Sequence, residues 1–245
     1  MSDPADSALA AVKRLLRPES RVAVLTGAGV SAASGVPTFR GAADSLWENM
    51  RPEELATPEA FARDPEKVWR WYDWRRGLVA ACAPNAAHHA LAALQDRVAS
   101  LTVITQNVDG LHQRAGSRDV VEFHGSLWRV RCTGCGRETE DHRVPLPLPP
   151  RCDACGELLR PGVVWFGEAI PAAALEAATA AVTGCDLLLV VGTSGVVYPA
   201  AGLARLAAET GAVVAEFNLE PGGIAAWTHH FVPGGAEETL PRLLD

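Results

Sequence analysis

Short apolar runs that end in small or polar side chains recur along this chain, with helical patterns between them. Runs of this length, rich in β-branched residues and bounded by turn formers, are typical of buried strands. They span residues 21–26, 101–104, 186–191 and 213–217. An alanine-rich helical pattern covers 171–183. The alternation predicts an α/β protein with a doubly wound parallel sheet, whose ligand site lies along one edge of that sheet.

The N-terminal segment has the pattern of an amphipathic helix that ends before Pro18. Its apolar positions Leu9, Val12, Leu15 and Leu16 recur at helical spacing on one face. The segment lacks the basic start and apolar core of a signal peptide. No uninterrupted apolar stretch reaches about 18 residues, the length that crosses a bilayer. We therefore expect a cytoplasmic protein with no membrane partner.

Composition and charge narrow the range of partners. With 245 residues and 48% apolar content, the chain can bury a core without disulfides. Its net charge of −7 and its lack of a basic run argue against nucleic acid, whereas an acidic surface tolerates lysine-rich protein substrates. We expect a monomer without a nucleic-acid partner.

The first apolar run leads directly into a glycine-containing segment, Gly27–Gly41, with the sequence GAGVSAASGVPTFRG. A strand, a glycine turn and a helix N-terminus form the arrangement that binds dinucleotide phosphates. The spacing is not G-x-G-x-x-G, because Ala32 stands where the third glycine would, and no Gly-Lys-Ser/Thr follows. The glycines could equally be needed for packing alone. Arg40 could hold a phosphate or carboxylate, or lie on the surface as a solvated arginine.

Polar residues follow the second apolar run, in the segment TQNVDGLHQRAGSRDVVEFHG (105–125). Asn107 and Asp109 suit a polar ligand at the carboxyl end of a strand, although both residue types also form turns. A further short strand, 120–123, leads to His124. Its imidazole could move a proton at neutral pH, or could be an ordinary loop histidine.

Two C-x-x-C pairs separated by 16 residues predict a zinc ribbon. The four cysteines are Cys132, Cys135, Cys152 and Cys155. Four thiolates complete a tetrahedral shell and leave no open position, so one structural zinc ion is expected. The alternative of two disulfides fits poorly with a chain that lacks a signal peptide. Cys82 and Cys185 lie outside the pattern and are expected to be buried free thiols.

The region between residues 45 and 95 has helical patterns, with a start signal at Asp64 and Pro65. Tyr72 and Arg75 are three residues apart, so their side chains point the same way. Spacing alone favours an aromatic core residue beside a surface arginine. The later segment 160–168 is apolar and extended; it could pair with a peptide as an exposed strand, or be an ordinary buried strand.

Taken in order, GAGVSAASGVPTFRG, TQNVDGLHQRAG, EFHG, the two C-x-x-C pairs, GTS and NLE resemble the sirtuins from about Val22 to Leu240. The resemblance implies a single catalytic region over 1–245 with a Rossmann-type NAD-binding domain. That domain would comprise 20–125 and 160–240, with a helical insertion at 45–95 and a zinc-ribbon insertion at 126–160.

The resemblance also implies that NAD is consumed as a co-substrate while an acylated-lysine protein or peptide is deacylated. Asn107 and Asp109 would orient the nicotinamide amide, the acyl oxygen would attack the ribose carbon, and His124 would act as general base. The products would be free lysine, nicotinamide and 2′-O-acyl-ADP-ribose. The implied cofactor-binding residues are Gly27, Ala28, Gly29, Ala32, Thr38, Phe39, Arg40, Gln106, Asn107, Asp109, Gly192, Thr193, Ser194, Asn218, Glu220 and Ala236.

Within the family, Tyr72 and Arg75 match the Tyr-x-x-Arg of class III sirtuins, which prefer negatively charged acyl groups. A guanidinium can hold a succinyl carboxylate through two hydrogen bonds, which an acetyl group cannot accept. We therefore expect desuccinylation and demalonylation, with deacetylation retained. Ala33 departs from the family, in which glutamate is common at this position. The implied substrate-binding residues are Ala56, Tyr72, Arg75, Val164, Phe166 and Gly167.

Other functions remain open at this point. A dehydrogenase would more often carry G-x-G-x-x-G with an acidic residue about 20 positions later, and would recycle its cofactor. An ADP-ribosyltransferase would release nicotinamide but label a protein, and a deacetylase could lack the acidic preference. A zinc-ribbon module that binds nucleic acid would have a basic ribbon, whereas five acidic residues offset the arginines here. They are Glu138, Glu140, Asp141, Asp153 and Glu157.

Overall fold

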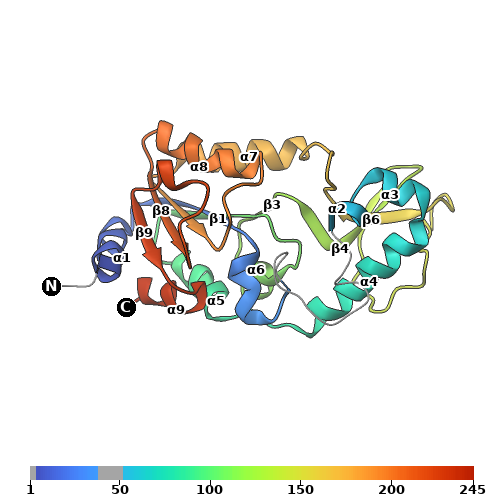
Figure 1. Ribbon diagram of the computed structural model, residues 1–245, viewed down its shortest axis with the longest axis horizontal. Helices are drawn as coiled ribbons and strands as arrows, with labels where there is room; N and C mark the ends of the chain where they lie inside the picture. The colour runs from blue at the N-terminus through green and yellow to red at the C-terminus, as the bar shows by residue number, and fades with distance from the viewer. Residues whose placement is uncertain (1–3, 38–51) are drawn as a thin grey trace.

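The computed structural model describes residues 4–37 and 52–245, which form a larger and a smaller lobe side by side (Figure 1). The larger lobe contains a six-stranded parallel sheet in the order β3-β2-β1-β7-β8-β9. Its strands are β1 (Arg21–Thr26), β2 (Ser100–Thr105), β3 (Val120–Glu122), β7 (Leu187–Val191), β8 (Val213–Asn218) and β9 (His230–Pro233). Strands β2 and β3 are added in succession on one side of β1, and strands β7, β8 and β9 follow in succession on its other side. The predicted doubly wound parallel sheet is confirmed, with its topological switch between β1 and β7.

Helices cover both faces of this sheet (Figure 1). One face packs against α1 (Pro4–Leu15), α5 (Ala86–Leu94) and α9 (Ala236–Thr239), and the other against α7 (Ala172–Gly184) and α8 (Ala200–Glu209). Strand β1 shows why both faces are apolar: Val22 and Val24 enter the first core, and Ala23 and Leu25 enter the second. Alternate residues of a strand point to opposite faces, so a strand covered on both sides is apolar throughout.

The smaller lobe joins a three-stranded antiparallel sheet to three helices. The sheet has the order β5-β4-β6, with β4 (Gly125–Cys132), β5 (Glu138–Glu140) and β6 (Leu159–Val163). The helices are α2 (Pro52–Leu55), α3 (Pro58–Arg63) and α4 (Pro65–Ala81). One apolar cluster contains residues from both, and the Trp69 indole of α4 donates to the Leu159 carbonyl of β6 at 2.7 Å.

The helices predicted between 45 and 95 therefore divide between two cores. Helices α2 to α4 pack on the ribbon, whereas α5 packs in the larger lobe. Helix α4 begins as expected, since the Asp64 carboxylate accepts the Lys67 N–H at 3.0 Å and Pro65 is its first residue. The domain boundaries stay predictions.

Short elements complete the fold. They are the 3₁₀ helices η1 (Ala28–Ser34), η2 (Ala225–Trp227) and η3 (Pro241–Leu243), and the single turn α6 (Leu111–Arg114). Among the helices within 4–37 and 52–245, none is both long enough and apolar enough to cross a membrane.

Candidate active site

The loops after β1 and β7 touch each other at the topological switch of the sheet. The Gly29 N–H donates to the Gly192 carbonyl at 2.8 Å, and the Gly27 N–H donates to the Val191 carbonyl at 3.1 Å. A Cβ atom on Gly29 would lie 2.7 Å from the Gly192 Cα, and one on Gly27 would lie 2.8 Å from the Thr193 Cβ. Both glycines are therefore required for the approach of the two loops, which is the packing role that the sequence left open.

The remaining residues predicted in the first loop lie around η1. Ala28 is half-buried and Ala32 is exposed, so neither side chain belongs to the core. Thr38, Phe39 and Arg40 lie outside the described residues.

A buried hydrogen-bond network links this loop to the Asn107–Asp109 segment after β2. The Ser31 hydroxyl donates to the Asp109 carboxylate at 2.8 Å. It also lies 3.1 Å from the Asn107 amide nitrogen, which donates to it and, at 3.1 Å, to the Gly27 carbonyl. The network thus fixes the orientation of the Asn107 amide: its nitrogen donates to Ser31 and Gly27, and its oxygen is left to accept.

His88 completes this network from α5. The Asn85 N–H donates to His88 Nδ1 at 3.3 Å, so we assign the proton to Nε2, which lies 3.3 Å from the Ser31 hydroxyl. Burial lowers the pKa of His88 to about 4, so the ring is neutral at physiological pH. Sequence reasoning missed Ser31 and His88 as members of the site. The only local signal was the position of His88 in the first turn of α5, three residues after the capping residue Asn85.

Asp109 is almost fully buried, with 4% of its surface exposed. Burial raises the pKa of its carboxyl group, and the Leu111 N–H, the Ser31 hydroxyl and the Arg75 charge act in the opposite direction. The carboxylate therefore has hydrogen-bond donors for both oxygens, because the Leu111 N–H lies 2.9 Å from Oδ1. A buried, fully oriented acceptor of this kind suits the amide of a ligand.

His124 stands at the junction of the lobes, immediately before β4. Its Nδ1 lies 3.1 Å from the Gln106 carbonyl, so Nδ1 carries the proton and Nε2 is left as an acceptor. Burial lowers the pKa of His124, and the bond to Gln106 opposes that shift. The imidazole is thus neutral at pH 7, the state that a general base requires.

A second group of predicted residues lies where β7 and β8 end. The Asn218 amide donates to the Thr193 carbonyl at 2.8 Å, and the Gln106 amide donates to the Thr193 hydroxyl at 3.1 Å. Ser194 is half-buried in the same loop. Glu220 is exposed and Ala236 is buried at the start of α9. The structure therefore brings Gln106, Thr193 and Asn218 together.

Glu216 was missed by sequence reasoning although it is 99% buried, with 1% of its surface exposed. Its carboxylate accepts the Gly222 N–H at 2.7 Å and holds the turn after Asn218. A Cβ on Gly222 would lie 2.8 Å from that carboxylate oxygen. A single acidic residue within an apolar strand was the available signal.

The residues predicted to bind the acyl group lie in the smaller lobe. Tyr72 is 2% exposed, and its hydroxyl accepts the Trp165 indole N–H at 2.9 Å. The Arg75 guanidinium lies 4.9 Å from the centre of the Trp71 ring. Burial lowers the pKa of Arg75, while the nearby Tyr72 and Asp109 raise it. The Arg75 side chain is half-buried, and Asp109 lies close enough to influence its pKa.

The segment predicted to pair with a peptide is tied to the rest of the chain. The Val164 N–H donates to the His124 carbonyl at 2.9 Å, and the Phe166 N–H donates to the Ala56 carbonyl at 2.9 Å. Phe166 is 47% exposed, and Gly167 has a φ of +85°. A peptide at this segment would have to pair with groups other than these two N–H donors.

The four predicted cysteines come together in the ribbon. Their Sγ atoms all lie within 4.8 Å of one another, with 3.4 Å between Cys132 and Cys155 and 3.8 Å between Cys135 and Cys152. Zinc–sulfur bonds of about 2.3 Å in a tetrahedron place sulfur atoms about 3.8 Å apart. The N–H of Cys135 lowers the pKa of the Cys132 thiol to about 6. The residues thus fit one structural zinc ion that would join the two knuckles.

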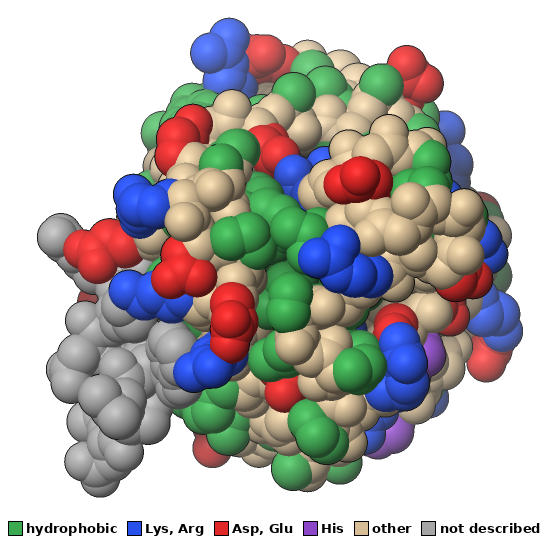
Figure 2. Space-filling view, turned by 90° about the vertical axis from the view of Figure 1, so that its right-hand side faces the viewer, with side chains coloured by type: hydrophobic (Ala, Val, Ile, Leu, Met, Phe, Trp, Pro, Cys, Tyr) green, Lys and Arg blue, Asp and Glu red, His purple; other side chains and the backbone are tan. Residues whose placement is uncertain are grey.

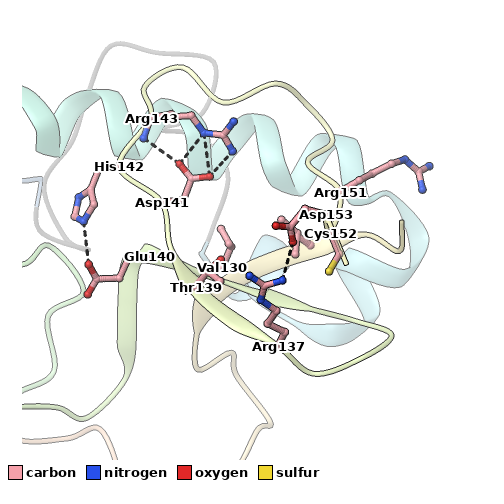
Figure 3. A pocket seen from close by; sticks show the side chains of 11 residues that line it. Val130, Arg137, Thr139, Glu140, Asp141, His142, Arg143, Arg151, Cys152 and Asp153 are labelled. Atoms are coloured by element: carbon pink, nitrogen blue, oxygen red, sulfur yellow. Dashed lines mark hydrogen bonds and ion pairs between the residues drawn. The ribbon is translucent and has the colours of Figure 1, made fainter. Parts of the chain in front are cut away.

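A separate hollow of about 620 Å³ lies on the ribbon (Figure 3). Two of its arginines form ion pairs, Arg137 with Asp153 at 3.1 Å and Arg143 with Asp141. Figure 2, which views the molecule from the end of the smaller lobe, shows acidic and basic side chains interspersed around hydrophobic ones.

A parallel sheet of this strand order, with an inserted four-cysteine lobe and a histidine at the junction, defines a dinucleotide-binding enzyme fold with a structural metal site. The sequence model of the Sir2 family matches residues 27–199 of this chain. NAD-dependent protein deacylase 2 of Pyrobaculum aerophilum is 55% identical over 234 residues, which are 96% of this chain and 94% of that protein. The chain therefore belongs to the Sir2 family, which confirms the resemblance to sirtuins.

Solved structures agree with this assignment. A crystal structure of a Sir2 homologue in complex with NAD has a TM-score of 0.89 at 47% identity, covering 96% of this chain and 92% of that one. A Sir2 variant with a deacetylated p53 peptide and 3′-O-acetyl ADP ribose has a TM-score of 0.83 at 32% identity, covering 96% and 97%.

Proposed function

We propose that this chain removes negatively charged acyl groups, succinyl and malonyl, from protein lysines, and that it retains deacetylation. The broader activity is NAD-dependent protein deacylation, for which the name of the Pyrobaculum relative and the NAD and peptide complexes of the Sir2 structures are the support. The acidic preference is supported mainly by the position of Arg75. This residue lies near the buried Tyr72, and the charge of Asp109 influences its pKa.

The geometry supports a defined role for each residue. The Asn107 oxygen and the Asp109 carboxylate bind the carboxamide of nicotinamide, because both are oriented acceptors held by Ser31. The acyl oxygen of the modified lysine attacks the ribose carbon and expels nicotinamide. His124 Nε2 then accepts a proton from a ribose hydroxyl, which attacks the acyl-derived carbon.

The acyl preference rests on the surroundings of Arg75. A carboxylate next to the half-buried Arg75 guanidinium would form charge-assisted hydrogen bonds, which are stronger than neutral ones. The Tyr72 hydroxyl accepts from Trp165, so its own proton is directed elsewhere and can bond a second carboxylate oxygen. Ala56 is buried next to this region and keeps the side-chain volume small.

A chain of contacts behind Tyr72 holds the pair in place. The Arg160 guanidinium lies 3.5 Å from the centre of the Trp165 ring. It is itself held by the Glu168 carboxylate through bonds of 2.6 and 2.8 Å. These contacts orient Trp165 and, through it, the Tyr72 hydroxyl, so that less conformational entropy is lost when this hydroxyl binds an acyl group.

The experiment is mass spectrometry of matched acetyl-, malonyl- and succinyl-lysine peptides incubated with NAD, using the wild-type chain and Arg75→Met. We expect Arg75→Met to lower kcat/KM for the succinyl peptide about 10- to 100-fold and to leave the acetyl peptide within about 2-fold. Arg70→Met is the matched control, because Arg70 lies on the same helix but is exposed and paired with Glu66. Equal losses for the acetyl and succinyl peptides would contradict the acidic preference.

The same measurement separates the other candidates. An ADP-ribosyltransferase would release nicotinamide and add mass to a protein, and an unselective deacetylase would favour the acetyl peptide. We propose acylated-lysine proteins as the substrates of a cytoplasmic monomer that binds neither nucleic acid nor membrane.

A further inference from the structure

Trp128 of the smaller lobe bonds directly to the loop that carries Asn107 and Asp109. Its indole Nε1–H donates to the Asp109 carbonyl oxygen at 2.7 Å. The neighbouring Leu127 N–H donates to the Val108 carbonyl at 2.9 Å. Strand β4, which begins directly after His124, therefore holds this loop through one main-chain and one side-chain donor.

The indole bond acts on a single peptide group. The Asp109 carbonyl belongs to the peptide that leads into Gly110, which has a φ of +76° and precedes α6. A Cβ on Gly110 would lie 3.0 Å from the Trp128 Cδ1, so the ring also packs against this turn. Rotation of the peptide group would move the Asp109 Cα and with it the carboxylate that Ser31 and Leu111 orient.

The indole is fixed by contacts within its own lobe. The His142 ring stacks on it with centroids 5.5 Å apart and an interplanar angle of 17°. The Arg76 guanidinium lies 5.1 Å from the ring centre. Arg76 is 1% exposed and donates to the carbonyls of Leu127, Asp141 and Arg143. The ribbon and α4 therefore hold the Trp128 ring from the side away from its hydrogen bond to the loop.

We propose that Trp128 is a positioning residue for NAD, which acts by holding the Asp109–Gly110 peptide so that the Asp109 carboxylate and the Asn107 amide meet the nicotinamide carboxamide. This inference rests on the proposed role of Asn107 and Asp109. An aromatic ring without a donor would fill the same space and leave the Asp109 carbonyl unpaired, so the hydrogen bond and the packing can be tested separately.

The test compares Trp128→Phe with Trp69→Phe. Both variants lose one indole hydrogen bond of 2.7 Å to a backbone carbonyl of the described chain, but the Trp69 bond goes to Leu159 and does not touch the loop. NAD binding is measured by isothermal titration calorimetry, melting temperature by calorimetry, and KM for NAD and for peptide by steady-state kinetics. We expect Trp128→Phe to weaken NAD binding and to raise KM for NAD about 10-fold, with KM for peptide unchanged.

We expect Trp69→Phe to lower the melting temperature and to leave NAD affinity within about 2-fold of wild type. If Trp128→Phe binds NAD as tightly as wild type, or if both variants weaken NAD binding equally, the proposal is wrong. Trp128→Leu is the second variant should Trp128→Phe fail to fold, because leucine also has no side-chain donor.

The failure of the proposed function would look different. A wild-type chain that binds NAD but deacylates no peptide would refute the deacylase assignment, and the calorimetric comparison of the two tryptophan variants would still decide the role of Trp128.

Discussion

The two lobes stabilise their buried polar groups in different ways. In the larger lobe the strands pair in a regular parallel ladder, and short side chains such as Ser31 and Asp109 bond one another at its edge. In the smaller lobe, long side chains reach across to backbone carbonyls: Trp69 to Leu159, and Arg76 to Leu127. A lobe with only a short three-stranded sheet has few ladder bonds, so side-chain donors and a metal take their place.

The lobes nevertheless depend on each other, because one strand connects the active site to the metal site. Strand β4 runs from Gly125, next to His124, to the metal-binding Cys132. The Leu127 and Trp128 donors to the Asn107–Asp109 loop lie on the same strand. Damage to the ribbon is therefore expected to reach the active site, whereas damage to the active site need not reach the ribbon.

Removal of zinc is the largest expected perturbation, since a structural zinc site contributes on the order of 10 kcal/mol to the folding of a small domain. A chelator should unfold the smaller lobe and abolish deacylation. Five of the six tryptophans within residues 4–37 and 52–245 lie in that lobe, so their fluorescence should shift to the red. They are Trp69, Trp71, Trp74, Trp128 and Trp165.

The larger lobe supplies the internal control for this experiment. Its parallel sheet has separate apolar cores on both faces, so much of the far-ultraviolet circular dichroism should survive chelation. Added zinc should restore both the fluorescence and the activity. Simultaneous loss of both signals would show that the lobes unfold as one unit, contrary to this expectation.

His124→Ala tests whether damage to the active site leaves the ribbon intact. Loss of a general base should lower kcat by about 10²- to 10⁴-fold, while the melting temperature and the tryptophan fluorescence stay near those of wild type. His89→Ala is the matched control, because His89 is an exposed histidine on α5. A variant without His124 that keeps full activity would refute the role of the base.

The pH profile of the wild type sharpens this test. Because burial lowers the pKa of His124 below its ordinary value of 6.5, the neutral base should persist at pH values at which a free histidine is protonated. We expect the midpoint of the acidic decline in kcat/KM to lie below pH 6.5. A decline that starts well above pH 6.5 would indicate another titrating group.

The smallest expected effect is the acid stability of the larger lobe. Burial lowers the pKa of His88 to about 4 and that of His112 to about 3, from 6.5. Below pH 6.5 the unfolded chain therefore binds protons that the folded chain does not. The free energy of unfolding decreases as the pH is lowered, until the pKa values of the folded state are reached. The slope is at most about 1.4 kcal/mol per pH unit for each histidine. Urea titrations of wild type and His112→Asn should show a shallower acid dependence for the variant.

The sequence predicted the sheet and the metal site because both leave local patterns. Apolar runs of strand length and C-x-x-C pairs can be recognised without knowledge of the rest of the chain. The connection of Ser31 with His88 could not be predicted, because 57 residues separate them and no short-range pattern marks the contact. For the same reason the use of the Val164 and Phe166 N–H groups within the chain was not foreseen.

Glycine loops show another limit of sequence reasoning. Gly27 and Gly29 were compatible with a ligand-binding turn and with packing alone, and the sequence did not indicate that the backbone around Gly192 would lie against them. The acyl preference, the domain boundaries and the roles of Thr38, Phe39 and Arg40 stay predictions.

The interlocked glycines have a practical consequence for protein engineering. A Cβ on Gly192 would lie 2.5 Å from the Val30 nitrogen, so a substitution at any one of the three positions forces two backbones apart. Libraries that randomise this turn to alter cofactor choice would consist mostly of misfolded clones. The turn after β8 is a better place to diversify, because Leu219 is 74% exposed there and Glu220 also faces solvent.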